Sequence, residues 1–315
     1  MSFSNDVKNE LARIDAAKAC CTLAEIGGFV KACGVISPLG GDKLRLTMHT
    51  ENSAVVRHYK TLFKEYFDVD PDVAIIKTNA LNRQRRFSLI LDDNEDQKAE
   101  IILRELGILI YNKGISRISD DINEQLIKTK CCRKAYMRGA FLGAGTMSDP
   151  DKAYHIEFVC NNDATAQAMK KLLNSFIDIS AKKFERNDKH VVYIKEAEQV
   201  GDILNLLGAH QQFFVFQDKR MTKEMRNVTN RISNCDSANT DRIVDAAQKQ
   251  IAAIRKIEEV KGLECLPEKL REVAELRLEN PYAGLSELAL MLEPNLSKSG
   301  LNNRIKKILK IADEI

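Results

Sequence analysis

The chain has no long run of apolar residues and no secretory signal. Its 315 residues are 44% hydrophobic, but no stretch approaches the ~20 apolar residues that a helix needs to cross a bilayer. Residues 1–8 lack the basic start and apolar core of a signal peptide. These absences predict a cytoplasmic protein without a membrane partner. The length exceeds one ordinary core and predicts about two or three domains.

Cysteine is scarce, and its spacing is unusual. The eight cysteines are too few for the disulfide framework of a secreted protein, and four of them form the adjacent pairs Cys20-Cys21 and Cys131-Cys132. Structural zinc sites usually separate paired cysteines by about two to four residues, because the side chains of neighbours diverge. Duplication alone explains the two pairs, and a zinc site is the alternative. We therefore expect no metal ion and no cofactor.

Charge and histidine content give little support for catalysis. The formal net charge is only +3, which does not by itself indicate a nucleic-acid partner. No histidine spacing is typical of a catalytic or metal-ligating set, so strand and surface positions are expected for all of them. The five are His49, His58, His155, His190 and His210.

Two copies of one glycine-rich pattern are the strongest positive signal. Residues 20–34 and 131–145 both open on a Cys-Cys pair and close on a glycine, at a constant offset of 111 residues (131 − 20 and 145 − 34). The pattern predicts a pseudo-dimer that arose by duplication and is joined along a helix pair. Such helices can approach closely where side chains are small. The small residues are Gly27, Gly28, Gly139, Ala140 and Gly143.

After each copy, the two halves continue alike. Alternating apolar residues predict strands, at 44–49, 73–77 and 86–91 in the first half and at 155–160, 179–184 and 190–195 in the second. Helices are predicted at 53–67, capped by Asn52 or Ser53, and at 163–176, capped by Asn162 or Asp163. A closing helix in each half contains Leu-x-x-Leu-Gly, at 103–107 and 204–208. Before the first copy, Ser4 could cap a helix through Val7, Leu11 and Ile14. Each half is predicted to be α-β-β-α-β-β-α, with three of its four strands located by residue.

This order resembles the LAGLIDADG homing endonuclease fold. The resemblance implies one α+β domain over residues 1–216, with halves of about 1–113 and 114–216, in which two sheets form a saddle for duplex DNA. Active members of that family place an acid before the closing glycine of each motif, and the two carboxylates hold divalent metal. Those positions are Cys33 and Ala144 here, and neither side chain can ligate Mg²⁺. We expect no catalytic residues and no enzyme; a residual metal-dependent endonuclease is the alternative.

An arginine-rich segment lies between two predicted strands of the first half. Arg83, Arg85 and Arg86 could contact DNA phosphates from the saddle. A solvated hairpin tip is the alternative. The matching segment of the second half, residues 185–190, has mixed charge, which argues against a symmetric DNA clamp.

Residues 217–261 are predicted to form a basic, polar connector that contains one helix. Asn239 or Thr240 could cap that helix. Its apolar face would comprise Ile243, Ala246, Ala247, Ile251 and Ile254. Upstream, residues 226–236 are rich in Asn, Ser and Arg, which indicates a hydrogen-bonding turn that could also touch a phosphate backbone.

Residues 262–315 are predicted to form a helix-turn-helix domain. Pro267 opens a first helix that ends near Asn280, a second helix covers 285–292, and Ser297 caps a third. Opposite the apolar stripe of the third helix, polar and basic side chains are predicted to bind DNA. They are Ser297, Lys298, Ser299, Asn302, Asn303, Arg304, Lys306, Lys307 and Lys310. A three-helix bundle with a solvated charged face is the alternative.

The combination of a degenerate LAGLIDADG pair with a C-terminal helix-turn-helix resembles the WhiA family of bacterial DNA-binding regulators. Residues 1–11, 230–239 and 296–304 carry the likeness. It implies double-stranded DNA as partner, a nucleoid-associated location, and transcription regulation linked to sporulation or to cell division and chromosome segregation. The alternative is a chromosome-associated adaptor whose LAGLIDADG-like domain holds a transcription or cell-division protein.

Overall fold

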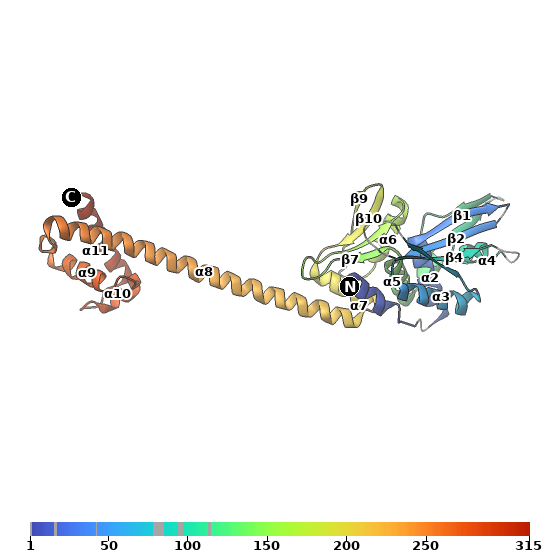
Figure 1. The fold of residues 1–315 in the computed structure, drawn as a ribbon, viewed down its shortest axis with the longest axis horizontal. Helices are drawn as coiled ribbons and strands as arrows, with labels where there is room; N and C mark the ends of the chain where they lie inside the picture. Colours follow the sequence, from blue (N-terminus) through green and yellow to red (C-terminus); the bar gives the residue numbers. More distant parts are fainter. Residues whose placement is uncertain (1, 16–17, 42, 78–84, 94–96, 113–114) are drawn as a thin grey trace. The chain divides into compact units, whose positions relative to one another are not determined.

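The computed structural model describes residues 2–15, 18–41, 43–77, 85–93, 97–112 and 115–315. The chain divides into two compact units, Met1–Lys223 and Glu224–Ile315 (Figure 1). The predicted domain boundary at residue 216 falls inside a helix, α8 (His210–Lys261), whose first residues belong to the first unit and whose later residues belong to the second.

The first unit contains the predicted α-β-β-α-β-β-α order twice. The first copy comprises α2 (Ala19–Cys33), β1 (Gly34–Gly40), β2 (Lys43–Thr50), α3 (Ser53–Phe67), β3 (Asp72–Lys77), β4 (Arg85–Asp92) and α4 (Lys98–Glu105). The second comprises α5 (Lys130–Ala144), β7 (Gly145–Met147), β8 (Ile156–Cys160), α6 (Asp163–Leu173), β9 (Lys182–Arg186), β10 (Lys189–Ile194) and α7 (Ala197–Leu207). This confirms the α+β fold class and the duplication.

Local sequence signals explain most of the boundaries. Asn52 and Asn162 cap α3 and α6, because each side-chain oxygen accepts hydrogen bonds from backbone N–H groups of the first turn. Gly107 (φ +66°) and Gly208 (φ +101°) follow α4 and α7 in the left-handed conformation that favours glycine. In the second half, α6 ends at Leu173, before the predicted 176, and β9 begins later than the predicted 179.

The chain start differs from the prediction. Ser2, and not Ser4, caps α1 (Phe3–Leu11), because its hydroxyl accepts the N–H of Asn5. Ser4 lies within the helix, where its hydroxyl accepts the backbone N–H of Met147 at 3.2 Å. The helix ends at Leu11, so Ile14 lies beyond it. Between the two copies lie a hairpin, β5 (Leu109–Asn112) and β6 (Ile115–Ile118), and a 3₁₀ turn, η1 (Glu124–Ile127).

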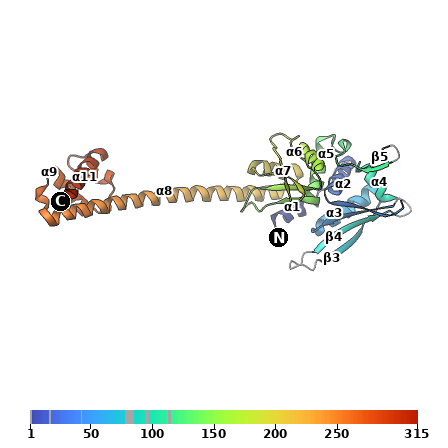
Figure 2. The ribbon, with the colours of Figure 1, turned by 90° about the horizontal axis from the view of Figure 1, so that it is seen from above.

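The two four-stranded sheets have equivalent antiparallel topologies, β1-β2-β4-β3 and β7-β8-β10-β9. Figure 2 shows helices α3 and α4 lying along the strands of the first sheet. Alternation along the strands gives each sheet a core face, where Leu46 lies opposite Leu91 and Phe158 lies opposite Val192.

Helices α2 and α5 pack side by side at the centre of the unit, with one sheet on either side (Figure 1). Gly28 and Gly139 permit this approach: a Cβ atom would lie 2.1 Å from the Tyr136 carbonyl oxygen at Gly28 and 2.0 Å from the Glu25 carbonyl oxygen at Gly139. Gly27 was predicted to lie between the two central helices, but a Cβ atom added there would lie nearest to the Leu126 side chain of η1, at 2.7 Å.

The second unit contains the C-terminal residues of α8, then η2 (Leu263–Cys265), α9 (Glu268–Glu279), α10 (Leu285–Met291) and α11 (Lys298–Asp313). Its core takes Ile254 and Ile257 from α8 and Leu301, Ile305 and Ile308 from α11. The last turns of α8 are therefore part of this unit.

Helix α8 corrects two predictions for the connector. Residues 226–236 are helical and form no turn, and Thr240 does not cap a new helix, because its hydroxyl donates to the Asp236 carbonyl inside α8. Asn, Ser and Thr lower helix propensity by only tenths of a kcal/mol each, and residues 210–261 contain neither glycine nor proline. The apolar face of this helix was predicted to begin at Ile243. Ile243 and Ala246 are exposed, and the first buried members of the predicted face are Ala247 and Ile254.

Candidate nucleic-acid interface

Helix α11 is fixed at its start and along one side. The Ser297 hydroxyl accepts the backbone N–H of Gly300 at 3.1 Å, which caps the helix. Its buried stripe is formed by Leu301, Ile305, Ile308 and Ala312. Because an α-helix has about 3.6 residues per turn, this stripe determines which residues face outward.

The opposite side of α11 carries most of the predicted DNA-binding residues. By helical spacing, Ser299, Asn303, Lys306, Lys307 and Lys310 share that side, and Asn302 borders it. All the predicted residues are exposed except Asn302 and Arg304, which are half-buried; the exposed ones are Ser297, Lys298, Ser299, Asn303, Lys306, Lys307 and Lys310.

Arg304 lies apart from this group. Its guanidinium donates to the Lys269 carbonyl at 3.4 Å and lies 3.9 Å from a carboxylate oxygen of Glu272, both on α9. The polar side of α11 therefore presents ammonium and amide groups, while Arg304 links α11 to α9.

A hollow of about 530 Å³ opens where α10 and α11 begin, lined by Leu285, Ser297, Lys298, Ser299 and Asn302. The first N–H groups of a helix attract anions. The hollow thus places a lysine, two hydroxyls and an amide beside the positive end of α11.

Buried Arg277, which the sequence reasoning did not single out, holds the link between α9 and α10. Its side chain is 2% exposed and donates to the carbonyls of Asn280 (3.3 Å) and Ala283 (2.7 Å). The turn after α10 is held by the Leu296 N–H, which donates to the Ala289 carbonyl at 3.0 Å.

The positions that carry metal-binding acids in active LAGLIDADG enzymes lie at the last residues of α2 and α5, beside a hollow of about 520 Å³. Cys33 lines this hollow, and burial raises the pKa of its thiol to about 12. Lys8 lines it too; burial lowers its pKa to about 8, partly offset by the nearby Cys33 and Glu51. Among the described lining residues Glu51 carries the one carboxylate, so the site does not fit a paired-carboxylate metal centre.

The predicted arginine contacts of the saddle are only partly described. Arg83 lies outside the described residues, and Arg85 is the first residue of β4. Arg86 is exposed, lines the hollow, and lies 3.9 Å from a carboxylate oxygen of Glu51.

Sequence reasoning missed a buried charge cluster across the α2–α5 pair. Glu25, fully buried on α2, accepts two hydrogen bonds from the Arg138 guanidinium of α5 at 2.7 and 2.9 Å. His58 Nε2 lies 2.8 Å from the other Glu25 oxygen. The expectation that His58 lies on a strand or the surface is therefore wrong: it lies on α3 and is buried.

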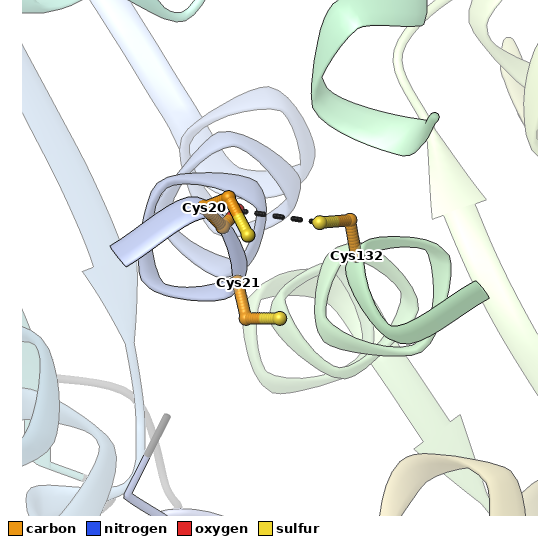
Figure 3. A group of neighbouring side chains, drawn as sticks. All are labelled: Cys20, Cys21 and Cys132. Atoms are coloured by element: carbon orange, nitrogen blue, oxygen red, sulfur yellow. Dashed lines mark hydrogen bonds between the residues drawn. The ribbon is translucent and has the colours of Figure 1, made fainter. Parts of the chain in front are cut away.

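The expectation that adjacent cysteine side chains diverge is also wrong at the first pair. The Sγ atoms of Cys20, Cys21 and Cys132 all lie within 4.8 Å of one another (Figure 3). Local spacing gave no sign of this cluster, because Cys132 comes from the other half.

Three family models match consecutive parts of the chain. Residues 19–109 match the WhiA N-terminal LAGLIDADG-like domain, residues 133–226 the WhiA LAGLIDADG-like domain, and residues 229–312 the WhiA C-terminal HTH domain. The chain belongs to the WhiA family.

Individual members of the WhiA family are similar over the whole length. The chain is 41% identical over 313 residues to the probable cell division protein WhiA of Alkaliphilus metalliredigens, covering 99% of this chain and 98% of that protein. It is 42% identical over 316 residues to the protein of the same name from Clostridium perfringens, covering 100% and 98%. The crystal structure of full-length DUF199/WhiA from Thermotoga maritima has a TM-score of 0.58 at 25% identity, covering 100% and 99%.

These matches confirm the helix-turn-helix and the LAGLIDADG-like fold. The WhiA HTH match begins at residue 229, within α8, in agreement with the contribution of α8 to the core of the second unit. Among the described residues, no helix has both the length and the apolar character that crossing a membrane requires.

Proposed function

We propose that the protein binds double-stranded DNA through the outer side of α11, with α10 and α11 as the helix-turn-helix. The observation that carries the proposal is the two-sided character of α11: one apolar stripe is buried, and the side opposite presents hydroxyl, amide and ammonium groups. A helix of this kind enters the major groove in helix-turn-helix proteins.

Sequence reading is assigned to Ser299, Asn302 and Asn303. An asparagine amide can donate to N7-side acceptors and accept from the amino group of adenine, and serine can pair with several base edges. These residues lie near the start of α11, the part of a recognition helix that contacts bases.

Affinity is assigned mainly to lysines. Lys306, Lys307 and Lys310 would neutralise phosphates along the groove walls, and such contacts position the protein without reading sequence. Ser297 and Lys298, beside the hollow at the helix start, would hold a further phosphate. Arg304 contacts α9, so we propose that it supports the position of α11 and makes no direct contact with DNA.

The first unit is proposed to have no nuclease activity. Cys33 and Ala144 cannot hold Mg²⁺, and a Lys8 ammonium beside this hollow would repel a divalent cation. Asp149 and Asp151, the acids beyond the end of α5, lie 3.1 and 2.7 Å from the Lys219 ammonium. They are thus already engaged by a lysine.

The biological role is proposed as that of a nucleoid-associated transcription regulator in the cytoplasm. The name probable cell division protein, carried by full-length relatives, supports a function in cell division. We extend the same proposal to a role in chromosome segregation or in sporulation.

The first unit is proposed to hold a protein partner. On the sheet faces away from the core, Arg45 forms two 2.6 Å hydrogen bonds with Asp92, and Arg186 lies 3.2 Å from Glu157. Arginines neutralised in this way favour a protein surface over a phosphate backbone. Tyr193 adds a half-buried aromatic cluster with Phe184 and His155, at ring distances of 5.1 and 5.8 Å.

Genome-wide mapping of bound DNA in the native cell tests the proposal. The parent should enrich discrete sites that share a motif, and Asn302→Ala with Asn303→Ala should lose that motif while retaining nonspecific binding. Lys249→Ala, an exposed change on α8, serves as the control. If the asparagine variant enriches the same sites as the parent, α11 does not read the sequence.

A further inference from the structure

Three cysteine sulfurs meet at the N-terminal ends of the two central helices, and a fourth cysteine lies beside them in the chain. Cys20, Cys21 and Cys132 have Sγ atoms within 4.8 Å of one another, and Figure 3 shows them converging from the two facing helices. The Cys132 thiol also lies 3.6 Å from the Cys20 carbonyl oxygen. Cys131 precedes Cys132 in the first turn of α5 and is the fourth cysteine of this region.

The separations suit a single soft cation. Zinc binds thiolate sulfur at about 2.3 Å, which places the sulfurs of a tetrahedral site about 3.8 Å apart. Small side-chain rotations bring three sulfurs within 4.8 Å to that spacing. Each helix contributes one adjacent pair, so the duplication supplies a complete set of four ligands.

Access also fits a metal site. Cys20 and Cys131 are exposed whereas Cys21 and Cys132 are buried, so the cluster has a solvent side through which an ion can enter. On that side the Thr129 hydroxyl lies 3.1 Å from the Cys131 sulfur.

We propose that Cys20, Cys21, Cys131 and Cys132 form a tetrathiolate site for zinc that joins the N-terminal ends of α2 and α5. Binding releases the thiol protons and closes the seam between the halves with metal–sulfur bonds. The site is separate from α11, so the proposal does not depend on DNA binding.

Cobalt and zinc provide the test on the full chain, reduced and stripped with a chelator. Cobalt should give the absorption bands of a tetrahedral thiolate complex, zinc should displace it, and metal analysis should find about one zinc per chain. Because zinc binds the folded form, its addition should raise the melting temperature of the first unit.

Variants decide whether these cysteines are the ligands. Cys20→Ser and Cys131→Ser alter exposed side chains, so folding should persist, and each should abolish the thiolate spectrum. Cys235→Ser and Cys265→Ser, also exposed, are matched controls that should retain it. An unchanged spectrum in Cys20→Ser would overturn the proposal. So would the absence of zinc uptake by the reduced parent.

Discussion

Replacing Gly139 by alanine tests the packing of the two halves. A Cβ atom there would lie 2.0 Å from the Glu25 carbonyl oxygen and 2.9 Å from the Phe29 backbone nitrogen. Neither backbone atom can move without moving α2, so the helices must separate by about 1 Å to restore van der Waals distance. The separation also stretches the buried Glu25–Arg138 pair, now at 2.7 Å.

The expected cost follows from two opposing effects. Alanine in a helix interior is favoured over glycine by about 1 kcal/mol, whereas overpacking costs about 1–3 kcal/mol and a disrupted buried ion pair costs about 3–5 kcal/mol when fully broken. A net loss of about 3 kcal/mol is expected for a partly stretched pair. For a unit of this size, that loss lowers the melting temperature by about 6–12 °C.

Calorimetry of the full chain should show this loss in the transition of the first unit. Gly28→Ala should behave similarly, since its Cβ would lie 2.1 Å from the Tyr136 carbonyl oxygen. Gly143→Ala is the matched control, because its Cβ would come no closer than 3.0 Å to any neighbour: Ala32 Cβ at 3.0 Å, the Phe29 carbonyl oxygen at 3.2 Å and Cys33 Sγ at 3.3 Å. A melting temperature for Gly139→Ala at or above that of the parent would refute the packing account.

Three further predictions concern other parts of the chain. Arg277→Met should destabilise the second unit by about 1–3 kcal/mol, measured by urea unfolding, because the carbonyls of Asn280 and Ala283 lose their donor; unchanged stability would contradict the role of Arg277. Cys33→Asp with Ala144→Asp should lower the melting temperature in chelator and recover it in Mg²⁺, whereas strong Mg²⁺ stabilisation of the parent would indicate a working metal centre. In metal-free protein, the Thr129 hydroxyl and the Cys21 thiol lower the pKa of Cys131 to about 7, so alkylation of Cys131, followed by mass spectrometry, should rise with pH around that midpoint; a midpoint near 9 would contradict the lowered pKa.

The order of elements could be predicted because it depends on local patterns. Alternating residues located β2 and β8, and Asn52 and Asn162 marked the starts of α3 and α6. Strands β1 and β7 were not located by residue: β1 contains Pro38 next to an irregularity in its pairing, and β7 has only three residues. The polar turn predicted inside α8 shows that composition without a helix-breaking residue is a weak signal.

The candidate site could be predicted only where residues of one helix share a side. The spacing on α11 was sufficient to group Ser299, Asn303 and Lys306, but not to place Arg304 against α9. Contacts between distant segments leave no local pattern. Glu25 and Arg138 are 113 residues apart in the chain, and Cys20 and Cys132 are 112 apart.

The most direct test of DNA binding by α11 is the salt dependence of affinity. For the full chain on one duplex, Lys306→Ala with Lys307→Ala should weaken binding to all sequences. The same change should reduce the slope of log K against log salt by about 0.9 for each phosphate that the protein no longer neutralises, or about 2 for both lysines. Lys249→Ala with Lys261→Ala removes the same charge from exposed positions on α8 and should leave the slope nearly unchanged. Equal slopes for the parent and the α11 variant, or an equal reduction in the α8 control, would contradict the proposal that α11 is the DNA-binding helix.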